Sequence, residues 1–216
     1  MLLTSLIGLL MATSIAISSV VPSDETLKIA FDRGQRFYVI EDYDQAIEKF
    51  LIVESSEDSR FVDETHVLIQ VGDLSFPVKV AATFQLANSH RSLAVDQLNK
   101  AAQERDESRA EVLRQQATEN FTRAAHYYRE ASQSTELLEI RVLSQHQLVK
   151  TNFQSSNYEG VIEEAGVLIE SFPESDYVDE ALYELGWAHF SLGQFSEAIA
   201  AFERLDRLGT AADYRI

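Results

Sequence analysis

Five histidines, at positions 66, 90, 126, 146 and 189, are the side chains best suited to acid–base or metal chemistry in this chain of 216 residues. None of them pairs with another histidine or with a carboxylate at the spacing of a zinc site. Glu163 and Glu164 are adjacent, so they point apart on a helix and do not form an acid–base pair. The sequence therefore predicts neither a catalytic centre nor a metal centre.

Other reactive groups are also absent. The chain has no cysteine, which excludes disulfides, thiolate metal sites, cysteine catalysis and a lipid on an N-terminal cysteine. Its glycines are isolated inside or beside expected helices, so no glycine-rich loop is available to hold a phosphate. We expect no cofactor and no small-molecule substrate.

Charge narrows the choice of partners. The chain has 35 acidic and 18 basic residues, a net charge of −17, and residues 1–23 contribute none of it. An acidic surface repels phosphate backbones and anionic lipid headgroups. We therefore expect no nucleic-acid partner, and the acidic excess serves either solubility or a basic protein partner.

The clearest structural pattern lies between Glu174 and Leu205. It predicts two amphipathic helices joined by a tight turn that ends at Gly193, because a residue without Cβ adopts a left-handed cap at low cost. One stripe of the first helix contains Leu182, Leu185, Gly186 and His189, and one stripe of the second contains Phe195, Ala198, Ile199 and Phe202. The small residues Gly186 and Ala198 allow the two backbones to approach closely. Such a pair needs similar pairs stacked beside it to bury its apolar face.

Similar pairs precede it. An aromatic residue followed by a small residue and then a large apolar one occurs at Tyr43–Ala46–Phe50, Phe121–Ala124–Tyr128, Tyr158–Val161–Ala165 (with a smaller final residue) and Phe195–Ala198–Phe202. Together with Leu182-x-x-Leu185-Gly186-x-x-His189, Ala198-x-x-x-Phe202 and Pro173, this pattern resembles the tetratricopeptide repeat, a helix–turn–helix unit of about 34 residues.

The resemblance covers roughly residues 25 to 216 and implies an all-α, right-handed solenoid of about four repeats, at about 25–56, 78–133, 136–173 and 177–207. The second repeat is expected to carry a long inserted helical hairpin that turns near Arg105 to Ser108, because the segment is rich in helix formers. This arm is either a solvated insertion or a docking arm. Residues 54–77 interrupt the pattern, and their β-branched residues around Gly72-Asp73 suggest either a small hairpin or a helix fragment.

The ends of the chain carry separate expectations. Residues 1–21 resemble a secretory signal, since the apolar run from Leu2 to Ile17 ends in the small-x-small sequence Ala16-Ile17-Ser18, although no Lys or Arg precedes the run. The alternative is a retained inner-membrane anchor over residues 2–21, which would be the chain's only membrane contact. At the other end, either the array continues beyond Ile216 or Ala211–Ile216 forms a short cap.

The resemblance also implies a partner-binding groove lined by the first helix of each repeat. Its positions in this sequence are Phe31, Gln35, Tyr38, Asn88, Arg91, His146, Lys150, Phe153, Tyr183, Trp187 and Phe190. Exposed aromatic residues beside a few polar ones suit a peptide or protein ligand, and Arg91 and Lys150 could meet an acidic group. The alternative is that neighbouring repeats cover these aromatic residues.

The function expected from these features is a non-catalytic protein–protein interaction scaffold of the bacterial periplasm or cell envelope. The residue pattern of the last repeat is similar to that of outer-membrane β-barrel assembly lipoproteins and of the periplasmic partner of the Tol–Pal system. The alternative is an N-terminal regulatory or docking domain of a larger secretion protein or enzyme.

Overall fold

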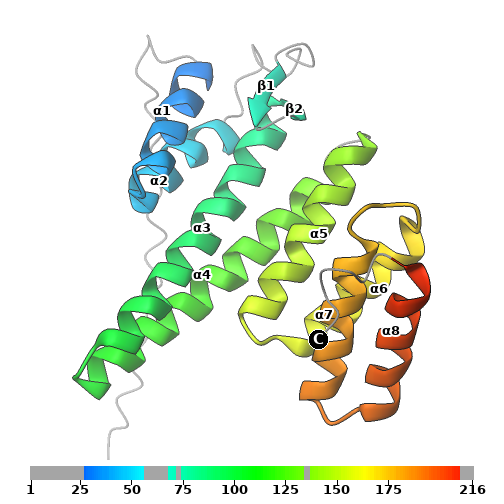
Figure 1. Ribbon diagram of the computed structural model, residues 1–216. Helices are drawn as coiled ribbons and strands as arrows, with labels where there is room; N and C mark the ends of the chain where they lie inside the picture. Colours follow the sequence, from blue (N-terminus) through cyan, green and yellow to red (C-terminus); the bar gives the residue numbers. More distant parts are fainter. Residues whose placement is uncertain (1–26, 56–67, 72–73, 134–136, 210–216) are drawn as a thin grey trace, which may run out of the picture.

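The protein is built from pairs of helices that follow one another along the chain. The computed structural model describes residues 27–55, 68–71, 74–133 and 137–209. Within them lie the helices α1 (Leu27–Val39), α2 (Tyr43–Glu54), α3 (Val78–Gln103), α4 (Glu107–Gln133), α5 (Leu138–Gln154), α6 (Tyr158–Ser171), α7 (Val178–Ser191) and α8 (Phe195–Leu208). Figure 1 shows the helical pairs side by side, with α3 and α4 extending well beyond the others. The expected signal or anchor segment and Ala211–Ile216 lie outside the described residues.

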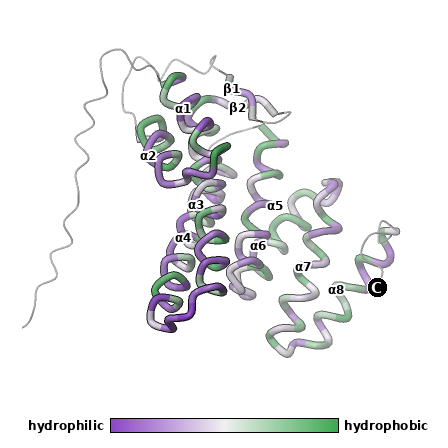
Figure 2. Tube along the Cα trace, turned by 60° about the vertical axis from the view of Figure 1, so that its left-hand side comes forward, coloured by the Kyte–Doolittle hydropathy of each residue, from purple (hydrophilic) through white to green (hydrophobic). Residues whose placement is uncertain are grey.

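Most helices bury some of their residues and expose the others, whereas α3 is buried at every residue from Val80 to Ala87. Figure 2 shows hydrophobic and hydrophilic residues alternating along the helices. Among the described residues, none of the helices combines the length and the apolar character needed to cross a bilayer.

Three of the pairs turn in the same way. Glu41, Ser156 and Gly193 have φ values of 63°, 58° and 73°, and each stands just before the residue that caps the second helix. The caps are Asp42, whose carboxylate accepts from the backbone N–H of Gln45, Asn157, whose amide oxygen accepts from that of Gly160, and Gln194, which makes no such side-chain bond. Gly193 confirms the predicted left-handed turn.

An aromatic pair spans each of these turns. The last turn of the first helix and the first residue of the second helix contribute one ring each: Tyr38–Tyr43 at 5.7 Å, Phe153–Tyr158 at 6.3 Å and Phe190–Phe195 at 5.6 Å between ring centroids. Rings five residues apart therefore hold both helices to the turn. Phe121 differs, because it lies in the middle of the lengthened α4, where it is buried.

Close helix approach is achieved by a glycine facing a phenylalanine. A Cβ added to Gly186 would lie 2.5 Å from the ring of Phe202, and one added to Gly34 would lie 2.6 Å from the ring of Phe50. The predicted role of Gly186 is therefore confirmed, and the first pair uses the same device. In the third pair, Val149 stands at the position of the glycine and Ala165 at that of the phenylalanine, and both are fully buried in one cluster. The smaller residue of this pair therefore lies on the second helix.

The placement of Phe31 in a groove is wrong. Phe31 is 1% exposed, and its ring packs 5.4 Å from that of Phe50 in the core between α1 and α2. The reason is that Gly34 admits Phe50 so deeply into α1 that the neighbouring aromatic ring is enclosed with it.

The pairs also pack on one another. Each second helix lies against the first helix of the following pair, α2 on α3, α4 on α5 and α6 on α7. The first helices pack together as α1 with α3 and α5 with α7, and no comparable packing joins α2, α4, α6 and α8 in the described residues. The ion pair Arg129–Glu164 does connect α4 to α6 through long side chains.

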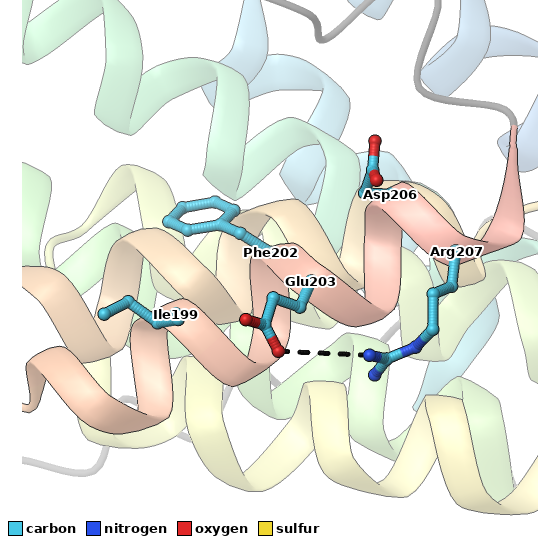
Figure 3. A pocket seen from close by; sticks show the side chains of 5 residues that line it. All are labelled: Ile199, Phe202, Glu203, Asp206 and Arg207. Carbon is cyan, nitrogen blue, oxygen red and sulfur yellow. Dashed lines mark ion pairs between the residues drawn. The ribbon is translucent and has the colours of Figure 1, made fainter.

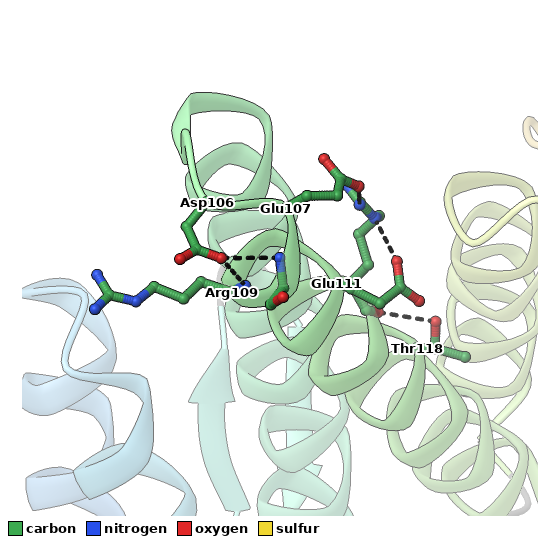
Figure 4. A network of polar contacts seen from close by, with 7 residues as sticks. Asp106, Glu107, Arg109, Glu111 and Thr118 are labelled. Carbon is green, nitrogen blue, oxygen red and sulfur yellow. Dashed lines mark hydrogen bonds and ion pairs between the residues drawn. The ribbon is translucent and has the colours of Figure 1, made fainter.

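The arm formed by the far halves of α3 and α4 turns where predicted, between Gln103 and Glu107. Asp106 caps α4 by accepting from the backbone N–H groups of Ser108 and Arg109, and Arg114 pairs with Glu107 and Glu111 on its surface (Figure 4). Small buried residues, including Ala94 and Ala117, hold the two helices together.

The structure also decides between the two alternatives for residues 54–77. The strands β1 (Leu68–Val71) and β2 (Leu74–Pro77) pair antiparallel, with Leu68 opposite Pro77, so the hairpin is correct and the helix fragment is wrong. The expected all-α class therefore needs this small addition, which fits the strand propensity of Ile69, Val71 and Phe76. Ile69 is buried against the first core cluster and anchors the hairpin.

Candidate interaction surface

Polar contacts connect neighbouring first helices in three places, α1 to α3, α3 to α5 and α5 to α7. The groups that form them, which we call the polar row, are Gln35 on α1, Gln85, Asn88 and Arg91 on α3, His146, Gln147 and Lys150 on α5, and Glu180 on α7. The Nε2 of Gln85 donates to Gln35 Oε1 at 3.0 Å, and the Nδ2 of Asn88 donates to Gln85 Oε1 at 2.8 Å. Arg91 donates to Gln147 Oε1 at 2.8 Å, which connects α3 to α5.

Asn88 and Arg91 are held from behind by Tyr128 of α4. The Tyr128 hydroxyl donates to Asn88 Oδ1, and the guanidinium of Arg91 lies 5.9 Å from the centre of the Tyr128 ring. Burial raises the pKa of Tyr128, so its hydroxyl stays protonated as the donor that this bond requires. The two side chains are therefore fixed in orientation while remaining partly accessible.

The row ends in a His–Glu–Lys cluster between α5 and α7. Glu180 accepts from Lys150 Nζ at 2.7 Å and lies 2.7 Å from His146 Nε2. Burial lowers the pKa of His146, although the charge of Glu180 acts to raise it. The imidazole is therefore neutral and its Nε2–H donates to Glu180. Burial alone would raise the pKa of Glu180, but the hydrogen bond from Lys150, the charge of Lys150 and the hydrogen bond from His146 bring it below its ordinary value.

This cluster contains a histidine–carboxylate pair, which sequence reasoning did not find. Its geometry gives a substrate no access to the imidazole, because His146 is 3% exposed and its Nδ1 is buried without a partner. Tyr177 stacks on the ring with centroids 4.2 Å apart. A depression of about 550 Å³ lies next to Tyr177 and is lined by residues of α5, the end of α6 and the segment between α6 and α7. His146 is not among the residues that line this depression.

Glu184 lies one turn beyond the cluster on α7 and is also buried. It is 6% exposed, and its Oε2 has no hydrogen-bond partner. Burial, together with the charge of Glu180, raises the pKa of Glu184 to about 8, although Lys150 and Arg91 act in the opposite direction. At neutral pH this side chain is a carboxylic acid that can donate a hydrogen bond.

Aromatic side chains occupy the rest of α7. Trp187 packs against Tyr183 at 6.3 Å, Phe190 at 5.5 Å and Phe202 of α8 at 6.0 Å. It is half-buried, so it stabilises the contact between α7 and α8 while leaving part of its ring at the surface. Phe190 is the most exposed of these rings, at 51%.

All of the predicted groove residues except Phe31 thus fall into three groups. Gln35, Asn88, Arg91, His146 and Lys150 come together in the polar row. Tyr38, Phe153 and Phe190 form the aromatic pairs across the turns, and Tyr38 also reaches Ser92 Oγ at 3.3 Å. Tyr183 and Trp187 line α7, whereas Phe31 is in the core.

The remaining members of the surface, Gln85, Gln147, Glu180 and Glu184, were not predicted. Their spacing offered a signal, since Gln147 directly follows a predicted position and Glu180 and Glu184 lie four residues apart on one face of the helix. In the described part of the chain, no group of three or more residues could hold a metal ion.

Comparison with known proteins agrees with the packing of the last helical pair. No curated protein matches the chain. The family model of the Tetratricopeptide repeat matches residues 179–205, which span most of α7 and α8. A tetratricopeptide repeat is therefore present within the pair α7–α8.

Proposed function

We propose that the protein is a non-catalytic scaffold that binds a protein or peptide along the polar row. The observation that carries this proposal is the row itself, whose hydrogen bonds join α1 to α3, α3 to α5 and α5 to α7 and which includes the partly accessible side chains of Gln35, Asn88, Arg91, Gln147 and Lys150. The tetratricopeptide repeat at residues 179–205 supports the same function, since such repeats generally bind protein or peptide partners.

The packing of the helices supports a concave surface at this place. α1 packs on α3 and α5 packs on α7, whereas no comparable packing joins the second helices in the described residues, where Arg129 and Glu164 connect α4 to α6 through long side chains. A stack that is closer together on one side curves toward that side, and repeat stacks of this kind use their concave surface for binding. About four right-handed repeats with the first helices inside would place the polar row along the groove.

The chemistry of the surface favours an extended peptide with hydrogen-bonding groups and one apolar anchor. Gln35, Asn88 and Gln147 carry amides that can pair with a peptide main chain, and Arg91 and Lys150 add positive charge to an otherwise acidic protein. Phe190, with half of its surface exposed at the end of α7, offers a contact for an apolar side chain.

A pair of matched variants tests this function. The protein retained by the wild-type chain in a pull-down is identified, purified and titrated by calorimetry against Arg91→Ala/Gln147→Ala. We expect the affinity of this double variant for the partner to fall at least about tenfold, because both of its substitutions remove groups of the polar row. Arg114→Ala/Gln115→Ala removes the same residue types from the arm and should leave affinity unchanged. Equal affinities of the two double variants, or a loss confined to the arm variant, would contradict the proposal.

We also propose that the scaffold acts in the bacterial periplasm or envelope. The support is the uncharged, apolar segment Leu2–Ile17, at whose end Ala16-Ile17-Ser18 forms the small-x-small pattern of a signal-peptidase site. Expression of the full chain in a Gram-negative host, followed by fractionation and mass spectrometry of the N-terminus, measures this directly. We expect a periplasmic product that begins shortly after Ser18. An uncleaved product in the cytoplasm would refute export.

A further inference from the structure

The outer face of α8 differs from the matching faces of the earlier second helices. α2, α4 and α6 are each covered by the first helix of the next pair, whereas no helix of the described chain covers α8. Phe195 and Ile199 are 58% and 59% exposed. The residues at the position of Phe195 in the other second helices, Tyr43, Phe121 and Tyr158, are partly or fully buried, and so are Ile47 and Ile162 at the position of Ile199. A depression lined by Ile199, Phe202, Glu203, Asp206 and Arg207 lies on this face (Figure 3).

The three internal contacts indicate what kind of group fits this face. In each of them a second helix receives an amphipathic first helix that runs back along it. α8 has 14 residues, so the complementary group is a helix of about 20 Å. An exposed apolar face on α8, where the same face of α2, α4 and α6 is covered by a helix, marks an interaction site.

The first helix at the other end of the molecule has a matching surface. Val39 and Ile40, at and just beyond the end of α1, are 78% and 68% exposed. α1 contains three basic residues and one acidic residue, a net charge of +2, in a chain whose net charge is −17. α8 contains three acidic and two basic residues, a net charge of −1. The two helices therefore complement each other in charge as well as in apolar surface.

We propose that copies of this chain associate head to tail, with α1 of one copy packed antiparallel on α8 of the next. This arrangement repeats the contact that each second helix makes inside the chain. It brings Ile40 close to Phe195 and places Arg36, one turn before Ile40, level with Ile199 and one turn from Glu203. The contact is independent of the polar row, because it uses the outer faces of the terminal pairs.

A head-to-tail contact joins different surfaces on the two copies, so association either closes into a ring or continues as a chain. Two copies paired through α8 alone would instead use the same surface twice. The two arrangements are distinguishable by cross-linking, and the natural absence of cysteine makes single-cysteine variants straightforward.

The test uses Ile40→Cys and Phe195→Cys, each as a full-length chain whose helical circular dichroism and melting match the wild type. After mixing and mild oxidation, we expect a disulfide-linked dimer that contains one copy of each variant, because a disulfide requires Cα atoms within about 7 Å. Each variant alone should stay unlinked. Val167→Cys, at a 43%-exposed position on α6, mixed with Ile40→Cys is the matched control and should give no dimer.

Sedimentation velocity supplies the second measurement. The wild type should gain mass with concentration, Arg36→Glu should weaken association at least about tenfold, and adding Glu203→Arg to the same chain should restore much of it. A wild type that remains monomeric at all concentrations overturns the proposal, whether α8 stays open or is covered by its own chain. Efficient linking of Phe195→Cys to itself overturns it as well, in favour of two-fold pairing.

Discussion

Replacing Glu184 with glutamine should stabilise the folded protein at pH 8 by roughly 3 kcal/mol and change its stability little at pH 5. The carboxyl group is 6% exposed, and its burial beside Glu180 raises its pKa to about 8 from an ordinary value of 4.5. Glutamine has the same shape and no proton to lose, so the replacement removes the cost of ionisation without leaving a cavity.

The sign follows from proton uptake. Between pH 4.5 and pH 8 the folded protein keeps a proton on Glu184 that the unfolded chain has lost. The free energy of unfolding therefore falls by about 1.4 kcal/mol per pH unit in this window, and this contribution is complete below pH 4.5 and lost above pH 8. The difference between Glu184→Gln and the wild type should widen steadily from pH 5 to pH 8.

Urea denaturation at several pH values measures this difference. Glu163→Gln, at an exposed position on α6, serves as the control and should follow the wild type throughout. A Glu184→Gln curve parallel to the wild type would show that the carboxyl ionises freely, and would contradict the enclosed environment assigned to it.

Gly34→Ala should destabilise the protein by about 2 kcal/mol, since overpacking in a filled core outweighs the gain in helix propensity. The new methyl group would lie 2.6 Å from the ring of Phe50, which is fully buried and is confined by Phe31. Gly186→Ala meets the ring of Phe202 at a similar distance, but Phe202 is only half-buried and can rotate outward. We expect that variant to lose less than about 1 kcal/mol.

Two further substitutions make this comparison specific. A Cβ on Gly166 of α6 would meet no atom within 4 Å, so Gly166→Ala should stabilise the protein by about 0.5–1 kcal/mol. Shortening the facing ring in Gly34→Ala/Phe50→Leu should cost less than the sum of the two single changes. Strict additivity, or a Gly34→Ala variant as stable as the wild type, would show that α1 and α2 are not in close contact at this point.

Local signals explain why most of the fold could be predicted. Gly193 marked one turn, Asp42 marked the capped start of a second helix, and the aromatic–small–large triplets placed that second helix within each pair. The arm was predictable for the same reason, because strong helix formers surround a short polar turn. Each of these signals is contained in a few consecutive residues.

Contacts between distant residues were harder to predict. His146 and Glu180 are 34 residues apart and meet only because α5 packs on α7, so no motif contains both. Phe31 was misplaced because its helical position was treated as equivalent to Tyr183, although Gly34 lets Phe50 enclose it. The hairpin remained undecided because short β-branched segments fit both a strand and a buried helix.

The same distinction separates packing from binding at the aromatic positions. Tyr38, Phe153 and Phe190 fit a groove pattern by spacing, yet each meets the aromatic residue five positions later across the turn. That second ring was visible in the sequence, and an aromatic residue at both positions could have identified the structural pair. Polar residues such as Asn88 and Arg91 were better indicators of the surface, because a buried core would not have accommodated them unpaired.

Photo-cross-linking tests the central claim most directly. A benzophenone amino acid is placed at Gln147, in the polar row, or at Glu163, on the exposed side of α6, and each variant is irradiated with the partner identified by pull-down. If the first helices form the binding surface, the Gln147 position gives a covalent complex with the partner and the Glu163 position does not. Cross-linking from Glu163 with none from Gln147 would contradict this account and place the partner on the second helices.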